Sequence, residues 1–386
     1  MNSITDNIMD NTTSNTTNNN ITVIGIGKLG LGFALLLEKN GFNVIGVDVN
    51  ENHVNNLNTK KYFSFEPKYN ELLQNSTNFY ATTSLKEGIQ FSDIIFIIVQ
   101  TPNCGGERFY DHTILSNLLI EINKLKPSNK NIIIGCTIMP KYINEVGIEL
   151  IKDCENCHLS YNPEFVAQGD IINGFEKPDI ILVGSNNPEL KPILKNIYSK
   201  ITIVNPNIKF LFLSPLDAEI VKISINSFIT TKIAFANIIS DLCDVMGANK
   251  HDVLLAVGSD SRIGNKYFKP GFSFGGPCFP RDTKAMKQLL DQNYIHSRLL
   301  ESTTLSNLDH VEFQTQQMLY SNLDEYIIEN VCYKENSIVP IIEESAKLKI
   351  AKNLHKYGKK IIIKDTPEII LEVKKEFGNI FNYIEK

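Results

Sequence analysis

The stretch Gly-Gly-Pro-Cys-Phe-Pro-Arg-Asp at 275–282 has the clearest chemical content in this chain. Its glycines allow a ligand or another backbone to approach closely, and Pro277 and Pro280 stiffen the loop on both sides of the sulfur of Cys278. If a helix begins near Pro280, Asp282 lies in its first turn and the helix dipole favours a thiolate at Cys278. The alternative is a small buried cysteine in a turn, since cysteine is among the most buried residue types. The motif therefore predicts a nucleophilic cysteine with an acid beside it.

A second motif is a glycine-rich turn, Gly25-x-Gly27-x-x-Gly30. An apolar run starting at Ile21 precedes it, a helical pattern follows, and the next apolar run ends in Asp48, as dinucleotide binding requires. The glycines let the pyrophosphate approach the helix N-terminus, and Asp48 can accept hydrogen bonds from ribose hydroxyls while repelling a 2′-phosphate. The alternative is a purely structural glycine turn. The context predicts an NAD site.

Other polar residues directly follow predicted strands or lie on one face of a predicted helix. Thr101, Thr137 and Glu164 each follow an apolar run, so all three are expected at the carboxyl edge of one sheet, where such sheets bind ligands. Lys222 and Asn226 are four apart in a helical pattern and so share one helix face. On their own, these residues are as readily explained as turn, capping and solvated polar groups.

The pattern of apolar residues predicts the strands and helices that carry these side chains. Buried strands are predicted at 93–99, 131–137, 158–161 and 178–184, and a long helix at 217–247. A second helical region is expected from about Pro280 through Leu319. From about Asp324, the chain again has a strand, helix and strand pattern.

This order predicts an α/β fold with an N-terminal Rossmann-type domain, a central all-helical domain and a small Rossmann-like C-terminal domain. The expected divisions are a disordered tail at 1–20, an NAD domain at 21–205, a helical domain at 206–323 and a last domain at 324–386.

Composition excludes several classes of function. A net charge of −5 gives no electrostatic footprint for nucleic acid, and the longest apolar run, Ile94 to Val99, is too short to span a bilayer. The first twenty residues do not resemble a secretory signal, and seven scattered cysteines favour reduced thiols in a cytoplasmic location. Cys154-Glu-Asn-Cys157-His158 matches a c-type haem attachment pattern, which would require export, so an incidental surface pair is the expectation, with a weak metal site as the alternative. We expect no metal, nucleic acid or membrane partner.

Seven motifs together resemble the UDP-glucose/GDP-mannose dehydrogenase family in order and spacing: GIGKLGLG, VQTP, CTIMP, NPEF, DAEIVKISIN, SRIGNKY and GGPCFPRD. The resemblance covers roughly residues 21–320. It implies oxidation of a nucleotide sugar from the C6 alcohol to the uronate with NAD, through a thiohemiacetal and a thioester on Cys278. UDP-glucose is the first choice of substrate, and GDP-mannose and a UDP-N-acetylhexosamine are the alternatives. It also implies a homodimer with shared active sites.

The resemblance assigns roles residue by residue. Lys222 and Asn226 would stabilise the developing oxyanion, Asp282 would assist proton transfer, Glu164 would activate water, and Thr137 would position that water. The implied cofactor contacts are Gly25, Gly27, Lys28, Leu29, Gly30, Asp48, His53, Thr101, Thr137, Gln168 and Arg281. The implied substrate contacts are Glu164, Phe165, Lys222, Asn226, Arg262, Tyr267, Lys269, Phe274, Gly275, Tyr333 and Lys334.

Some positions depart from the family pattern. Gln168 replaces a second acid, Cys136 replaces a serine, and the arginine expected after Tyr333-Lys334 is missing from IVPIIEES, which affects uridine recognition. A catalytically silent nucleotide-binding subunit is the alternative from another class, and binding without turnover would identify it. A simple two-electron hydroxyacid dehydrogenase would leave Cys278 without a role and would form one NADH per substrate.

Overall fold

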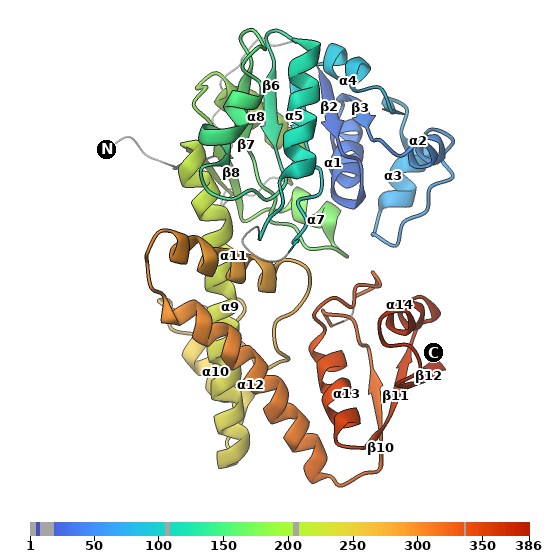
Figure 1. Cartoon of the computed structure of the whole chain (residues 1–386), viewed down its shortest axis with the longest axis vertical. Coiled ribbons are helices and arrows are strands. Elements are labelled where there is room, and N and C mark those ends of the chain that lie inside the picture. The colour runs from blue at the N-terminus through green and yellow to red at the C-terminus, as the bar shows by residue number, and fades with distance from the viewer. Residues whose placement is uncertain (1–4, 8–18, 105–108, 204–207, 336) are drawn as a thin grey trace. The chain divides into compact units, whose positions relative to one another are not determined.

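A computed structural model of the chain describes residues 5–7, 19–104, 109–203, 208–335 and 337–386. The chain falls into two units, Met1–Lys222 and Ile223–Lys386, and Figure 1 labels most of their elements.

The first unit is built on one sheet with strand order β1-β9-β8-β7-β6-β5-β2-β3-β4. Neighbouring strands are parallel except for the pairs β7–β8 and β1–β9. Its strands are β1 (Thr5–Asn7), β2 (Asn20–Ile24), β3 (Asn43–Val47), β4 (Phe79–Thr82), β5 (Ile94–Ile97), β6 (Asn131–Ile134), β7 (His158–Tyr161), β8 (Ile180–Gly184) and β9 (Lys209–Leu213). The run from β4 through β3, β2, β5 and β6 to β7 has the doubly wound order in which the direction of winding reverses between β2 and β5.

Both faces of this sheet are buried, as the near-continuous apolar strands predict. In β6, Ile132 and Ile134 pack into one apolar cluster and Ile133 into the other, because successive side chains of a strand point to opposite faces. One cluster is covered by α1 (Lys28–Lys39), α3 (Tyr69–Asn75), α7 (Ile171–Glu176) and α8 (Leu190–Ile201). The other is covered by α4 (Leu85–Phe91), α5 (Thr113–Leu125) and η1 (Tyr142–Gly147). The remaining helices of this unit are α2 (Glu51–Asn58) and α6 (Ile148–Leu150).

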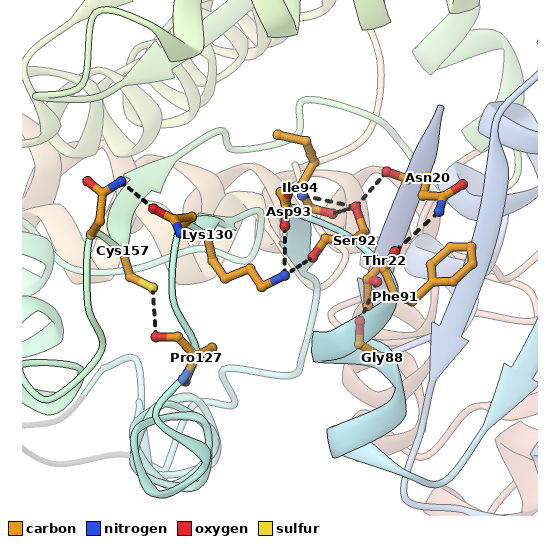
Figure 2. Close-up of polar contacts among 12 residues, drawn as sticks. Asn20, Thr22, Gly88, Phe91, Ser92, Asp93, Ile94, Pro127, Lys130 and Cys157 are labelled. Carbon is orange, nitrogen blue, oxygen red and sulfur yellow. Dashed lines mark hydrogen bonds and ion pairs between the residues drawn. The ribbon is translucent and has the colours of Figure 1, made fainter. Parts of the chain in front are cut away.

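Polar contacts tie the strands together at the amino-terminal edge of the sheet (Figure 2). Ser92 Oγ donates to the carbonyl of Asn20 at 2.5 Å, and Lys130 Nζ lies 3.0 Å from the Ser92 carbonyl and 2.7 Å from Asp93 Oδ1. Cys157 belongs to this edge, where its thiol lies 3.4 Å from the Pro127 carbonyl. Burial raises the pKa of the buried Cys154 to about 11 and that of Cys157 also rises, so the CxxC pair favours neutral thiols. This edge is opposite to the one at which the strands deliver Thr101, Thr137 and Glu164.

The second unit is mainly helical, followed by a small sheet. Helix α9 (Pro215–Met246) is continuous through the boundary at Lys222 and is followed by α10 (Lys250–Gly258), α11 (Phe279–Gln292) and α12 (Arg298–Tyr320). The sheet has parallel strands in the order β10 (Glu325–Glu329), β11 (Lys360–Asp365) and β12 (Asn382–Glu385), connected by α13 (Ala346–Lys356) and α14 (Pro367–Phe377). Among the described residues, no helix combines the length and apolarity needed to cross a membrane.

The predicted fold class is confirmed: an α/β unit with a doubly wound sheet, a helical centre and a small C-terminal sheet. Strand β1 lies within the tail expected to be disordered, and residues 1–4 and 8–18 of that tail lie outside the described residues. The domain boundaries at 205 and 323 and the tail at 1–20 stay predictions.

Candidate active site

The glycine turn has the geometry that a dinucleotide requires. Gly25 has φ +86°, and a Cβ there would lie 2.5 Å from the Ile98 carbonyl oxygen. A Cβ on Gly30 would lie 1.9 Å from the Gly25 carbonyl oxygen, so this position holds the turn tightly against α1. Gly27, at the N-cap of α1, differs because a Cβ there would meet no atom of the described residues within 4 Å. The open space therefore lies at the helix N-terminus, where a pyrophosphate fits.

This contrast gives a matched pair of variants. Gly27→Ala is expected to fold normally, because its φ of −66° suits alanine, but to bind NAD at least about 10-fold more weakly, because its methyl group enters the pyrophosphate space. Gly30→Ala is expected to destabilise the protein by about 3 kcal/mol or more, because of the clash with the Gly25 carbonyl. Thermal unfolding and NAD titration check the pair. Unchanged NAD affinity in a folded Gly27→Ala protein would place the pyrophosphate elsewhere.

Asp48 and His53 lie near the glycine turn, one after β3 and the other in the first turn of α2. Asp48 directly follows β3 and accepts the backbone N–H of Asn50 at 3.0 Å, while Asn50 itself caps α2 through the N–H of His53. His53 Nε2 lies 2.7 Å from the Ile26 carbonyl, so its ring is tied to the glycine turn. The end of β3 and the start of α2 therefore bring these two predicted cofactor contacts to one place. Lys28 is exposed and Leu29 half-buried in the same turn.

The predicted residues at the carboxyl edge follow adjacent strands. Thr101 is buried beyond β5, and Thr137 is half-buried beyond β6. Because β2, β5, β6 and β7 are parallel neighbours, the residues that follow them share the edge of the glycine turn. Cys136, beside Thr137, is buried, which raises the pKa of its thiol to about 12 and makes it a packing residue. Gln168 is half-buried further along the segment after β7.

Glu164 and Lys222 are brought together within the first unit. Lys222 Nζ donates to the carbonyl oxygen of Glu164 at 2.7 Å and lies 4.6 Å from the ring centroid of Phe165. The lysine is buried, and the carbonyl and the aromatic ring are its polar and cation–π partners there. Lys222, the predicted oxyanion donor, and Glu164, the predicted activator of water, therefore lie next to each other.

Tyr198, which the sequence did not single out, is the other neighbour of this acid. Its hydroxyl lies 2.6 Å from Asn162 Oδ1 and 3.5 Å from Glu164 Oε1, and the Asn162 amide donates to the Leu182 carbonyl. Loss of solvent raises the pKa of Glu164 to about 8, against the opposing effects of Lys222 and the Tyr198 hydroxyl. A carboxyl that titrates near neutrality is suited to general acid or base work.

In the second unit, Cys278 is the N-cap of α11 and is exposed. Pro280 lies in the first turn, as does Asp282, whose backbone N–H donates to the Cys278 carbonyl at 2.8 Å. The predicted helix start and first-turn acid are thus confirmed. An exposed sulfur at a helix N-terminus is the arrangement that favours a thiolate.

Asp282 is buried and bonded to the other predicted donor of this unit. Asn226 Nδ2 donates to Asp282 Oδ2 at 2.5 Å. The same stretch of α9 adds Ser227, whose hydroxyl lies 3.4 Å from the Asp282 carbonyl, and Thr230, whose hydroxyl is 2.8 Å from that of Thr283. The first turn of α11 is therefore held on α9 by buried polar contacts, one turn of helix after Lys222.

The glycine pair before Cys278 packs against the loop after β10. A Cβ on Gly275 would lie 2.2 Å from the Glu344 carbonyl oxygen, and one on Gly276 would lie 2.4 Å from the ring of Tyr333. The Gly276 N–H also donates to the Glu343 carbonyl at 3.0 Å, and Arg281 lies 3.7 Å from the Glu343 carboxylate. Tyr333 is thereby placed beside the cysteine loop, while Lys334 is exposed.

Asn307 of α12, also missed from the sequence, fixes the segment that leads to this loop. Its side chain accepts from the Phe274 N–H at 2.8 Å and donates to the Phe274 carbonyl at 3.0 Å. Nothing in a 23-residue helix marks one asparagine as a backbone partner, because only the tertiary fold brings residue 274 to it.

Three predicted substrate contacts lie together on the exposed 262–269 segment. The guanidinium of Arg262 bonds the Asp260 carboxylate through Nε and Nη2, with Nη2 2.7 Å from Oδ2. Tyr267 packs edge-on against Phe279 with ring centroids 5.9 Å apart. Lys269 is exposed. These side chains are accessible to a ligand or to another subunit.

Comparison with known proteins matches both units. Residues 19–202 match the NAD binding domain of the UDP-glucose/GDP-mannose dehydrogenase family, and residues 216–309 match its central domain. The UDP-glucose 6-dehydrogenase of Rickettsia conorii is 33% identical over 294 residues, which cover 75% of this chain and 66% of that relative, just under two thirds of its length. The UDP-glucose 6-dehydrogenase of Campylobacter jejuni is 28% identical over 381 residues, which cover 94% of this chain and 91% of the relative.

A solved structure has a similar fold. A UDP-glucose dehydrogenase from the hyperthermophilic archaeon Pyrobaculum islandicum aligns with a TM-score of 0.85 at 24% identity, covering 95% of this chain and 86% of that chain.

Proposed function

Since the chain belongs to the UDP-glucose/GDP-mannose dehydrogenase family, we propose that it oxidises the C6 alcohol of a nucleotide sugar to a carboxylate with NAD. The observation that carries the proposal is that each unit holds one part of the chemistry: the first has the open glycine turn and the Lys222–Glu164 contact, and the second has Cys278 at a helix N-terminus with Asp282 in the first turn. UDP-glucose is the proposed substrate. The UDP-glucose 6-dehydrogenases among its relatives support this choice over GDP-mannose, although one GDP-mannose 6-dehydrogenase is 27% identical.

NAD would be held by the turn at Gly25–Gly30 and by Asp48, with His53 and Thr101 lining the adenosine and nicotinamide ends. The carboxylate of Asp48 stands where a 2′-phosphate would be repelled, which favours NAD over NADP. When bound, NAD accepts a hydride in each of the two oxidation steps. All other parts of the chemistry fall to side chains of this chain.

In the first oxidation, C6–OH loses a hydride and a proton to give an aldehyde. The charge that develops on oxygen would be met by the Lys222 ammonium and the Asn226 amide, one helical turn apart, and preorganised donors of this kind contribute about 3 kcal/mol each. Asp282, held by Asn226 at 2.5 Å, would take the proton.

In the second oxidation, the Cys278 sulfur adds to the aldehyde carbon, and the oxygen takes up a proton to complete the thiohemiacetal. Loss of a second hydride and that proton gives a thioester. Water then attacks the thioester carbon, the carbon–sulfur bond breaks, and the sulfur leaves as the thiolate. Glu164 would accept the proton from this water, with Thr137 positioning it.

The rate of thioester hydrolysis should depend on pH in a defined direction. Burial raises the pKa of Glu164 to about 8, so its neutral form is favoured at pH 7, and the ionised base becomes available as the pH rises. Below that pKa, we expect the single-turnover rate of uronate release to rise about 10-fold per pH unit and to level off above it. A rate that is constant between pH 6 and 9 would rule out Glu164 as the base.

We also propose that the chain acts as a homodimer with shared active sites. On α9, Phe228, Phe235, Ile238, Leu242 and Val245 are all exposed, between 46% and 71%, and their spacing of seven, three, four and three residues places them on one helix face. An apolar stripe of this kind is typical of helix pairing. Arg262 on the exposed segment is the residue proposed to reach the partner's substrate.

The dimer proposal predicts that Phe235→Asp/Leu242→Asp yields a monomer with activity reduced at least about 10-fold, because two charges would be buried in the stripe. Light scattering and assay of the same sample check this. Leu371→Asp, at an exposed leucine of α14, is the matched control and should leave the dimer intact. A dimeric double variant would show that the stripe is not the interface.

The function itself is tested by incubating the protein with NAD and, separately, UDP-glucose, GDP-mannose and a UDP-N-acetylhexosamine while following NADH. NADH with at least one sugar, and fastest with UDP-glucose, is expected. Binding of NAD and sugar without NADH formation from any of them would instead support the silent nucleotide-binding subunit.

A further inference from the structure

The residues 64–70, here called the bridging segment, connect two parts of the candidate site within the first unit. The segment precedes and begins α3, and it carries two side chains that are almost fully buried, Glu66 and Tyr69. Neither residue belongs to the proposed chemistry. Each is bonded to a backbone group of a different site loop.

Glu66 holds the loop that carries the catalytic acid. Its Oε1 accepts the backbone N–H of Gly169 at 2.7 Å, at the end of the segment that begins with Glu164 and contains Gln168. The N–H groups of Gly169 and Ile171 stabilise the negative charge of this carboxyl, and α7 starts at Ile171. The N-cap residue Asp170 makes no side-chain cap hydrogen bond. The carboxyl of Glu66, which is not part of α7, therefore takes the place of a capping side chain at the N-terminus of this helix.

Burial of Glu66 carries a cost that calls for an explanation. Its Oε2 is buried and makes no hydrogen bond to the residues that the structure describes, and loss of solvent raises the pKa of this carboxyl. Burying a carboxyl with one oxygen unbonded lowers the stability of the folded protein. The hydrogen bond of Glu66 to the Gly169 N–H is therefore expected to have a role beyond stability.

Tyr69 connects the other end of the segment to the cofactor turn. Its hydroxyl donates to the Lys28 carbonyl at 2.7 Å, one residue after Gly27, and it packs so closely on α1 that a Cβ on Gly32 would lie 1.9 Å from the tyrosine oxygen. The Lys28 ammonium is also close enough to lower the pKa of Glu66.

The segment between these two contacts is closed by hydrogen bonds of its own. The Asn70 amide accepts from the Ser64 N–H at 2.9 Å and donates to the Ser64 carbonyl at 2.9 Å. Lys68 Nζ bonds Asn173 and Glu176 of α7, both at 2.8 Å, which adds a second connection to the same helix. Hydrogen bonds therefore link the segment to α7 at one end and to the glycine turn at the other.

We propose that Glu66 is a positioning residue for the Glu164–Gly169 loop, and that the bridging segment couples occupancy of the glycine turn to the placement of that loop. The proposal rests on the proposed function for the role of Glu164, but the coupling itself is a property of the first unit. It gives a role to a buried carboxyl that has no part in the proposed chemistry.

Hydrogen exchange of residues 165–171 tests the coupling without catalysis. In the parent protein, NAD should slow exchange of the Gly169 and Ile171 amides. Glu66→Ala should exchange rapidly there with or without NAD, whereas Glu66→Gln, which keeps an oxygen acceptor, should retain the protection. Tyr69→Phe should keep the basal protection and lose its dependence on NAD. Glu71→Ala, at an exposed acid of α3, is the control and should behave as the parent.

Kinetics separate positioning from a purely structural role. Glu66→Ala should hydrolyse the thioester about 10-fold more slowly or worse, with NAD affinity changed less than about threefold, since a small displacement of a catalytic group is costly. Parent-like exchange and hydrolysis in Glu66→Ala would overturn the proposal. If Glu66→Ala fails to fold, loss of NAD-dependent protection in Tyr69→Phe supports the coupling, and its persistence refutes it. Failure of the parent to oxidise any nucleotide sugar would refute the proposed function and leave the exchange result valid.

Discussion

Replacing Cys278 with serine is expected to abolish net uronate formation, with a loss of at least about 1,000-fold in the rate of the second oxidation. The hydroxyl of serine is a far weaker nucleophile at neutral pH than a thiolate, and the helix N-terminus and exposure that favour ionisation of Cys278 do little for an alcohol. The first oxidation uses other groups, so the variant should still form aldehyde. Uronate analysed by mass spectrometry, with NADH followed in parallel, checks the prediction.

Cys157→Ser is the matched control for this experiment. Cys157 lies at the amino-terminal edge of the first unit's sheet, where its thiol contacts the Pro127 carbonyl (Figure 2), and its replacement should leave turnover unchanged. An unchanged uronate yield from Cys278→Ser would discard the thioester mechanism.

Replacing Glu164 with glutamine is expected to trap the covalent intermediate. Glutamine keeps the shape of the side chain but cannot accept a proton from water, so steady-state turnover should fall about 100- to 10,000-fold. Both hydride transfers precede the blocked step, and therefore a burst of two NADH per active site should appear before the reaction stalls. Mass spectrometry of the intact protein should show the sugar attached to Cys278.

Asp170→Asn, at an exposed acid near the end of the same loop, should turn over normally. A Glu164→Gln protein that turns over at the parent rate would show that another group activates the water. Slow turnover without a burst would show that Glu164 acts before the thioester forms.

The parallel core of the first unit could be predicted from the sequence because buried strands and glycine turns leave local signals. The apolar runs at 93–99 and 131–137 contain β5 and β6, and Asp48 follows β3 as expected. The short edge strand β1 and the last elements, α14 and β12, have weaker patterns and were not predicted. The place of β1 depends on pairing with β9, which is far away in sequence, and β12 is a short edge strand that pairs with β11 alone.

The candidate site could be predicted in part for a similar reason. Cys278, Asp282 and the glycine turn lie in short motifs whose chemistry is local. Tyr198, Glu66 and Asn307 could not be found in this way, because each acts on a backbone or carboxyl group that only the folded chain brings near. The relation between Lys222 and the Glu164 carbonyl, 58 residues apart, is likewise a tertiary result.

The stoichiometry of the complete reaction distinguishes the thioester route from a simple two-electron oxidation. Limiting UDP-glucose should be converted in the presence of excess NAD, and NADH and product should be counted when the reaction ends. The thioester route predicts two NADH and one uronate per sugar, with no aldehyde released. One NADH per sugar, with an aldehyde or ketone as the final product, would contradict it.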